Sequence, residues 1–161
     1  LLAFTYSNIF KIPLTGMRFF TVYGPFGRPD MALFKFTKSI LNNKKIEVYN
    51  YGQHIRDWTY VDDVVNAIIK LLHKKSKKKV PHQIFNIGSD NPTKLLDFLN
   101  MLEKTLNKKT KIKFVKLQTA DVVKTHANIN KLKKISGFQP NTNLKNGINN
   151  FVRWYKDYYK K

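Results

Sequence analysis

Cysteine is absent from this 161-residue chain, which excludes a disulfide framework and a thiolate metal site. Long apolar runs are missing too, because none approaches the roughly 18 residues that a membrane-spanning helix needs. Residues 1–4 lack the basic segment and the cleavage site of a signal peptide. We therefore expect a cytoplasmic protein without a membrane segment. Its start at Leu1 rather than at Met indicates a piece of a longer polypeptide.

Acidic residues are scarce: 10 Asp and Glu stand against 30 Lys and Arg, and the formal net charge is +20. Such a charge is typical of proteins that bind nucleic acid or an anionic surface. Only four of the basic residues are Arg, however, and base readers and phosphate clamps favour the planar Arg fork. The Lys residues are scattered along the chain. The pattern favours a solvated surface that attracts anionic ligands over a nucleic-acid interface.

Aromatic residues are plentiful, and the 12 Phe, 8 Tyr and 2 Trp predict a packed core. Hydrophobic periodicity predicts strands that alternate with helices, which indicates the α/β class. The strands are short and too few for a complete doubly wound sheet, so we expect part of a larger fold. The expected strands are 14–20, 46–49, 56–60, 83–87 and 111–115; the expected helices include 2–11, 31–42, 128–135 and 144–159, and Asp30, Asp62 and Thr93 are expected N-caps.

A loop rich in Gly and Pro is expected at residues 21–29 (TVYGPFGRP), directly after the first strand. In an open α/β sheet, ligands bind beyond the carboxyl ends of the strands, which is where this loop projects. Gly24 and Pro25 are explained by the geometry of the turn. Thr21 and Arg28 are predicted to contact a ligand.

A second segment, residues 51–63 (YGQHIRDWTYVDD), combines polar and aromatic side chains and leads into a helix. Arg56 is the candidate for binding an anion, since a guanidinium offers parallel donors to a pyrophosphate. The alternative is a salt bridge from Arg56 to Asp57 or Asp62. Asp62 and Asp63 are predicted to cap the helix, which leaves less room for an anion at its N-terminus.

The spacing of the histidines does not predict a metal site. The four His residues are far apart in the sequence and do not show metal-ligand spacing, so we expect surface or structural roles for them: His54, His73, His82 and His126.

The order of these segments resembles the NAD-dependent epimerase/dehydratases of the extended short-chain dehydrogenase family. The run RFFTVYGPFGRPDMALFKF at residues 18–36 is similar to UDP-glucuronate 4-epimerases, and the wider family shares the IRDWTYVDD run at 55–63. The later runs FNIG (85–88), QTADV (118–122) and FVRWY (151–155) also fit. The resemblance covers essentially the whole chain. It implies the last strands of a Rossmann sheet plus the small helical substrate-binding domain.

For the sugar and the cofactor, the resemblance implies four roles. Thr21 would line the sugar pocket and donate to the uronic carboxylate, and Arg28 would help to hold the same sugar. Phe20 and Val22 would lie near the nicotinamide of NAD.

For the nucleotide, the resemblance implies that Arg56 binds the pyrophosphate of a UDP-sugar. Val48 and Tyr49 would lie along the uracil, and Asp121 would reach the ribose. Gln118 stands where many relatives carry a second phosphate-binding Arg, which weakens the expectation of a two-Arg clamp.

The family oxidises the C4 hydroxyl of the sugar by hydride transfer to NAD, lets the 4-keto sugar rotate, and returns the hydride to the other face. This chemistry uses a Tyr base with a Lys four residues later, and no Tyr in this chain has that partner. A Gly-x-Gly-x-x-Gly loop is absent as well. We therefore expect residues 1–161 to be a C-terminal substrate-binding half, with the catalytic pair and most of the NAD site in a preceding half.

The resemblance thus implies an isomerase that is active at full length, as a homodimer, on UDP-glucuronate. This chain alone is predicted to be inactive and to contain no catalytic residue. The alternatives are another epimerase, a dehydratase or a decarboxylase of the same family, a non-catalytic remnant that keeps only the fold, and a basic nucleic-acid-binding module.

Overall fold

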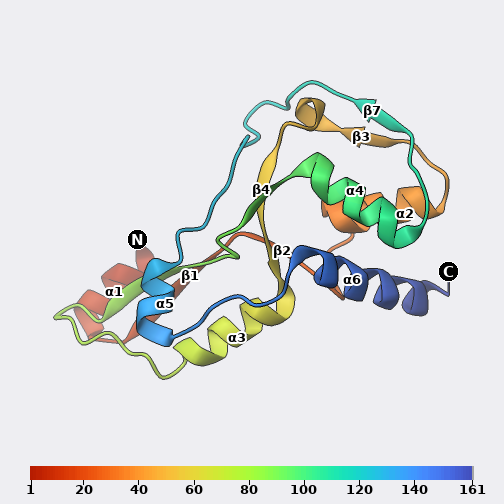
Figure 1. Ribbon diagram of the computed structural model, residues 1–161. Coiled ribbons are helices and arrows are strands. Elements are labelled where there is room, and N and C mark those ends of the chain that lie inside the picture. Colours follow the sequence, from red (N-terminus) through yellow and green to blue (C-terminus); the bar gives the residue numbers. More distant parts are fainter. Residues whose placement is uncertain (161) are drawn as a thin grey trace.

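The backbone alternates helices with short, mostly parallel strands, as the α/β expectation requires (Figure 1). The computed structural model describes residues 1–160. The helices are α1 (Leu2–Phe10), α2 (Ala32–Leu41), α3 (Val61–Leu71), α4 (Leu95–Leu106), α5 (Asn130–Ser136) and α6 (Leu144–Tyr159), with a short 3-10 turn η1 (Tyr49–Gly52). The strands are β1 (Leu14–Phe19), β2 (Thr21–Tyr23), β3 (Ile46–Val48), β4 (Ile55–Tyr60), β5 (His82–Ile87), β6 (Pro92–Lys94) and β7 (Ile112–Phe114).

The chain changes its strand partner at Phe20. Before this residue, β1 runs parallel to β5, with Phe19 opposite Ile87. After it, β2 runs parallel to β4, with Thr21 opposite Trp58. β4 also pairs antiparallel with β6, and β3 runs parallel to β7. Strands that diverge at their carboxyl ends open a crevice, which is where α/β folds bind ligands.

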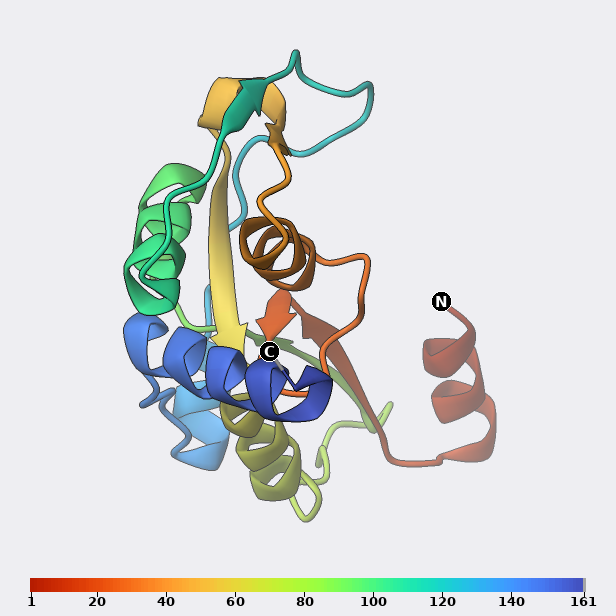
Figure 2. The same ribbon diagram turned by 90° about the vertical axis from the view of Figure 1, so that its right-hand side faces the viewer.

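Helices cover the β1–β5 pair on both faces. α1 lies on one side, and α3 and α5 lie on the other (Figure 2). The second side holds a core of fully buried apolar residues, in which Leu132 of α5 packs with Phe85 and Ile87 of β5. On the first side, α1 leaves Leu2 and Ile9 exposed.

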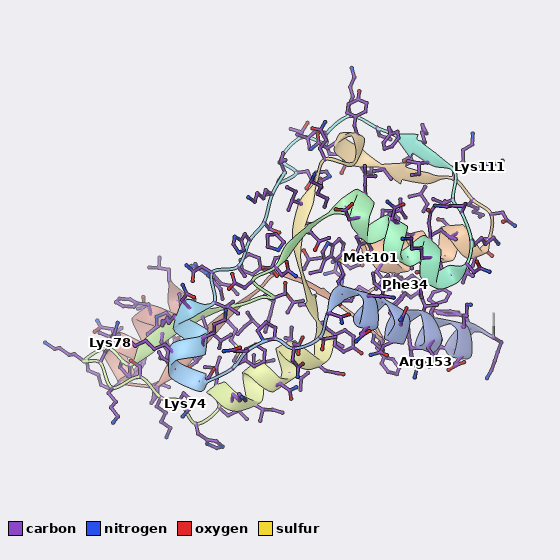
Figure 3. The ribbon with its side chains drawn as sticks, in the orientation of Figure 1. Phe34, Lys74, Lys78, Met101, Lys111 and Arg153 are labelled. Atoms are coloured by element: carbon purple, nitrogen blue, oxygen red, sulfur yellow. The ribbon has the colours of Figure 1, made fainter. Side chains whose placement is uncertain are left out.

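A larger core forms where α2, α4 and α6 surround β4. The indole of Trp58 on β4 stacks on Phe98 of α4, with ring centroids 4.0 Å apart. Phe34 of α2 packs edge-on against Tyr155 of α6 at 5.1 Å. Phe34 and Met101 lie among these helices (Figure 3). Aromatic pairs of this kind add to the stabilisation from buried apolar area.

The predicted α/β class is confirmed, and so are the bounds of the last helix. Two strands were not predicted. Residues 21–23 form β2 rather than the start of a loop, because β4 offers them a ladder of backbone hydrogen bonds. β6 contains Pro92, which reads as a turn residue in sequence but is tolerated on an edge strand.

The three expected N-caps were wrong. Helices α2, α3 and α4 follow Met31, Tyr60 and Lys94, and none of them has a side-chain cap. Asp30 bonds Arg28 instead. Helix α5 ends at Gly137, which takes the left-handed conformation typical of a glycine after a helix. No helix among residues 1–160 is both long and apolar enough to cross a membrane.

The stacked pair of Trp58 and Phe98 gives a test of the core. Phe98→Ala removes a ring that is fully buried, and we expect a loss of about 3–5 kcal/mol in the free energy of unfolding. Urea denaturation measures it. Phe114→Ala on β7, where the ring is about half exposed, is the matched control and is expected to cost less than about 1 kcal/mol. Equal losses for the two variants would contradict this description of the core.

Candidate functional site

A cleft of about 350 Å³ opens between the start of α2, β4 and the segment after β7. Its lining combines aromatic rings with charged groups of both signs, as a site for a polar ligand requires. The lining residues are Thr21, Asp30, Met31, Ala32, Lys35, Phe36, Glu47, Tyr49, His54, Arg56, Trp58, Leu95, Gln118 and Asp121.

The alternation of β4 supplies the central wall of the cleft. Side chains at positions i, i+2 and i+4 of an extended strand share one face. His54, Arg56 and Trp58 follow this spacing, and all three line the cleft. Asp57, between them, is buried elsewhere in the interior.

Arg56 lies in the cleft wall with a side chain that is 17% exposed. Its Nη2 donates to Oδ1 of Asp121 at 3.0 Å, and its Nη1 donates to the carbonyl of Val123 at 3.0 Å. The expected alternative was a salt bridge to Asp57 or Asp62, and the structure shows neither. The acidic partner is Asp121, which is 65 residues away in the sequence.

The segment that carries Asp121 is fixed to the beginning of β4. Ile55 donates its backbone N–H to Val123 and accepts one from Thr125, each at 3.0 Å. The backbone N–H of Asp57 donates to the hydroxyl of Thr125 at 3.2 Å. Asp121 therefore reaches the cleft from a segment that is held by hydrogen bonds.

Asp57 anchors the other face of β4. Its carboxylate is fully buried and accepts from the backbone N–H groups of Ser89 at 2.7 Å, Asp90 at 3.1 Å and Ala127 at 3.0 Å. Gly88 lets these segments meet, because a side chain there would collide with Ala127. The close approach of backbone at the end of β5 is thus a structural contact.

The residues predicted for the sugar and the cofactor fall into two adjoining clefts. Thr21 lines the cleft of Arg56. Phe20, Val22 and Arg28 line a second cleft of about 360 Å³, in which Phe20 and Val22 supply apolar surface. Met31 lines both clefts, so the two are neighbours.

Arg28 lies on an exposed loop between the two clefts. Its Nε donates to Oδ1 of Asp30 at 3.1 Å, and its Nη2 donates to Oδ2. The Arg28 guanidinium lowers the pKa of the Asp30 carboxyl. Phe26, in the same loop, has a positive φ of 60° and places its ring 5.1 Å from that of Trp154. Such a backbone conformation persists only where the surroundings hold it, and the Trp154 ring is one such contact.

The N-terminus of α2 also faces the first cleft. The helix begins at Ala32 without a side-chain cap, and Met31, Ala32 and Lys35 all line the cleft. The backbone N–H groups at a helix start carry a partial positive charge and favour anions. The sequence reasoning considered the start of α3 instead, where Asp63 in fact accepts the backbone N–H groups of Asn141 and Thr142.

The two residues predicted along the uracil differ in position. Tyr49 lines the cleft, and its hydroxyl donates to Glu47 at 3.5 Å. Val48 is fully buried in the core, because the side chains of β3 alternate and Val48 points inward with Ile46. Val48 is not among the lining residues.

His54 is the site residue that the sequence reasoning missed. Its side chain is only 5% exposed, and its Nε2 lies 3.0 Å from Oδ2 of Asp121. The two atoms do not form a hydrogen bond, because the angle between them is unfavourable. Its position two residues before Arg56 was the available signal, since it places both on one face of the strand. No group of three or more potential metal ligands occurs among residues 1–160.

Comparison with known proteins identifies the family. The model of the NAD dependent epimerase/dehydratase family matches residues 1–88, which is more than half of the chain. The chain belongs to this family. Its α/β fold, with short parallel strands beside a helical part, agrees with the resemblance seen in the sequence.

Curated relatives match over nearly the whole chain. Protein CapI of Staphylococcus aureus is 45% identical over 100% of this chain and 52% of its own length. UDP-glucuronate 4-epimerase 4 of Arabidopsis thaliana is 44% identical over 98% of the chain and 39% of its own length. The chain therefore spans about half the length of these relatives, or less.

A solved member of the family has the same fold. The UDP-glucuronic acid 4-epimerase of Bacillus cereus, in complex with UDP-glucuronic acid and NAD, superposes with a TM-score of 0.90 at 32% identity. The match covers 98% of this chain and 50% of that one.

The buried carboxylate of Asp57 gives a test of how the site is held. Asp57→Ala leaves the N–H groups of Ser89, Asp90 and Ala127 buried without their acceptor, and we expect a loss of about 3 kcal/mol or more in the free energy of unfolding. Urea denaturation measures it. Asp62→Ala, at an exposed position of α3, is the control and is expected to cost at most about 1 kcal/mol. If the two variants unfold at the same urea concentration, Asp57 does not anchor these segments.

Proposed function

We propose that this chain is the sugar-nucleotide-binding half of an NAD-dependent epimerase that inverts C4 of UDP-glucuronate to give UDP-galacturonate. The observation that carries the proposal is the cleft in which Thr21, Arg56 and Asp121 meet beside the N-terminus of α2. The 44% identity to a UDP-glucuronate 4-epimerase supports the choice of sugar.

The nucleotide end of the cleft suits a diphosphate. Arg56 offers a planar pair of donors, and Lys35 adds a second positive charge from α2. The uncapped start of α2 adds backbone N–H donors. Asp121 is an acceptor for ribose hydroxyls, and Tyr49 supplies an aromatic wall for a base.

The sugar end lies toward the loop of Arg28. The Thr21 hydroxyl can donate to a uronic carboxylate, and Arg28 can add a charge-assisted hydrogen bond from the exposed loop. A firmly held nucleotide and a less enclosed sugar suit an epimerase, because the 4-keto sugar must rotate between the two hydride transfers.

The residues that would contact NAD in this chain are apolar. Phe20 and Val22 line the second cleft and fit one face of a nicotinamide ring, but the sequence has no Gly-x-Gly-x-x-Gly loop for a dinucleotide phosphate. When bound, NAD supplies the acceptor and donor of the hydride. The role of Phe20 and Val22 is to orient the ring and to exclude water from it. The Tyr23 phenol does not serve as a base, because burial and the charge of Asp63 raise its pKa well above the usual value.

The preceding half of the protein would cover α1 and β1. α1 exposes Leu2, Ile9 and Phe10, and β1 exposes Phe19. The β1–β5 pair is a two-stranded sheet, too narrow to be stable by itself. We therefore propose a preceding NAD-binding half with the Tyr and Lys pair. The homodimer that the family resemblance implies for the full-length enzyme stays a separate proposal.

The first experiment measures turnover of UDP-glucuronate by the full-length protein that carries this chain, with NAD, by NMR of the sugar products. Arg56→Lys keeps the charge but loses the fork. We expect the KM to rise roughly tenfold or more while kcat changes little, since a charge-assisted hydrogen bond contributes about 1.5–3 kcal/mol.

Arg153→Lys on α6 is the matched control, because this Arg is exposed and lies away from the cleft (Figure 3). It should leave KM unchanged. Conversion of UDP-glucose in preference to UDP-glucuronate would overturn the uronate assignment, and it would leave another epimerase or a dehydratase of the family as the function. Loss of CO2 from UDP-glucuronate would instead indicate a decarboxylase, since only the uronate carries a carboxyl group.

The second experiment concerns the chain of residues 1–161 alone. We expect no epimerase turnover and no tight NAD binding, because the Tyr and Lys pair and the Gly-x-Gly-x-x-Gly loop are not in this sequence. Product NMR and calorimetric titration with NAD measure these two properties. Turnover by the chain alone would refute its assignment as a substrate-binding half.

The structure offers little support for a nucleic-acid-binding module. The Lys residues are spread over the molecule, with Lys74 and Lys78 at one end and Lys111 at the opposite end (Figure 3). A nucleic-acid surface would gather them on one face.

A further inference from the structure

The carboxylate of Asp121 in the cleft lies next to two groups of different kinds, a guanidinium and an imidazole. Oδ1 of Asp121 accepts from Nη2 of Arg56 at 3.0 Å, and Oδ2 lies 3.0 Å from Nε2 of His54. His54 is almost fully buried, whereas Asp121 is one-third exposed. Nε2 itself is shielded from solvent and has no partner in good hydrogen-bond geometry. The imidazole is therefore close to Asp121 but not yet bonded to it.

His54 is held in place by its backbone. Its carbonyl accepts the N–H of Leu95 at the start of α4 at 2.8 Å, and the next residue, Ile55, pairs with Lys94 of β6. The ring thus sits on a fixed support at the floor of the cleft. Oδ2 of Asp121 is already within hydrogen-bond distance of Nε2, so the two groups need only a change of direction to bond.

A diphosphate and Asp121 compete for the same guanidinium group. The Nη2 of Arg56 that now bonds Asp121 faces the cleft that the proposed function assigns to the diphosphate. When the ligand takes this donor, Asp121 loses its charged partner. A partly buried carboxylate that loses a partner is destabilised unless another donor replaces it.

We propose that His54 is a positioning residue, which takes over the Asp121 carboxylate when a ribonucleoside diphosphate engages Arg56. The exchange leaves Oδ1 of Asp121 free to accept a ribose hydroxyl, and Nε2–H of His54 holds Oδ2. The proposal rests on the proposed function, because it assumes a nucleotide in this cleft. It assigns His54 to recognition of the ribose rather than of the phosphates.

The test uses the full-length protein that carries this chain and calorimetric titration with UDP and with inorganic pyrophosphate. His54→Leu removes the donor, and His54→Gln keeps an N–H near the position of Nε2. We expect His54→Leu to weaken UDP binding about three- to tenfold, the value of one hydrogen bond, with pyrophosphate binding unchanged. His54→Gln should restore UDP binding to within about twofold of the unsubstituted protein.

The coupling to Asp121 is measured with a double-mutant cycle. In the Asp121→Asn background, His54→Leu should have little further effect on UDP binding. His73→Leu is the matched control, since this His is exposed at the end of α3, and it should bind UDP normally. Thermal unfolding of each variant checks that the fold is kept.

The outcomes separate the two proposals. If the unsubstituted protein binds pyrophosphate but not UDP, or binds neither, the proposed function fails and this inference fails with it. If UDP binds and His54→Leu weakens UDP and pyrophosphate equally, or weakens neither, only the inference is overturned. The inference is also overturned if His54→Leu weakens UDP binding as much in the Asp121→Asn background as in the unsubstituted protein.

Discussion

The alternating direction of the side chains along strand β4 controls the geometry of the site. Neighbouring side chains on a strand point to opposite faces, so Arg56 faces the cleft while Asp57 faces the interior. Both reach the segment of residues 121–127, Arg56 at its beginning and Asp57 at its end. If this segment moved away from β4, the backbone N–H of Ala127 would lose its acceptor on Asp57. A buried donor without an acceptor costs free energy. The wall of the cleft is therefore part of the folded core.

Burial divides the site into two ends with different freedom. At one end, Arg56 projects from β4 where this strand pairs with β6, and His54 comes directly before the strand. At the other end, Arg28 projects from an exposed loop, and the left-handed Phe26 in that loop packs on Trp154 of α6. Under the proposed function, the enclosed end would hold the nucleotide, and the exposed end would leave the sugar room to rotate.

Sequence reasoning found what depends on local pattern. Periodicity gave the α/β class and α6, and the IRDWTYVDD run directed attention to Arg56. It missed what depends on distant contacts. The partner of Arg56 is 65 residues away, so no spacing rule could indicate it. β2 was missed because its three residues gain strand structure only from β4. The Asp caps failed because Asp30 and Asp63 bond elsewhere, and Val48 was assigned to the uracil although its strand turns it into the core.

The pair of Arg56 and Asp121 also affects which ligands can bind. Both side chains are partly shielded from solvent, so salt screens their attraction less than it screens an exposed pair. Under the proposed function, a diphosphate would displace Asp121 from the guanidinium where a single weak anion would not, because it brings two negative groups that reach Arg56 and the start of α2 together. The Asp121 carboxylate would then raise the threshold for binding. It would also favour ligands that bond this carboxylate once Arg56 has released it.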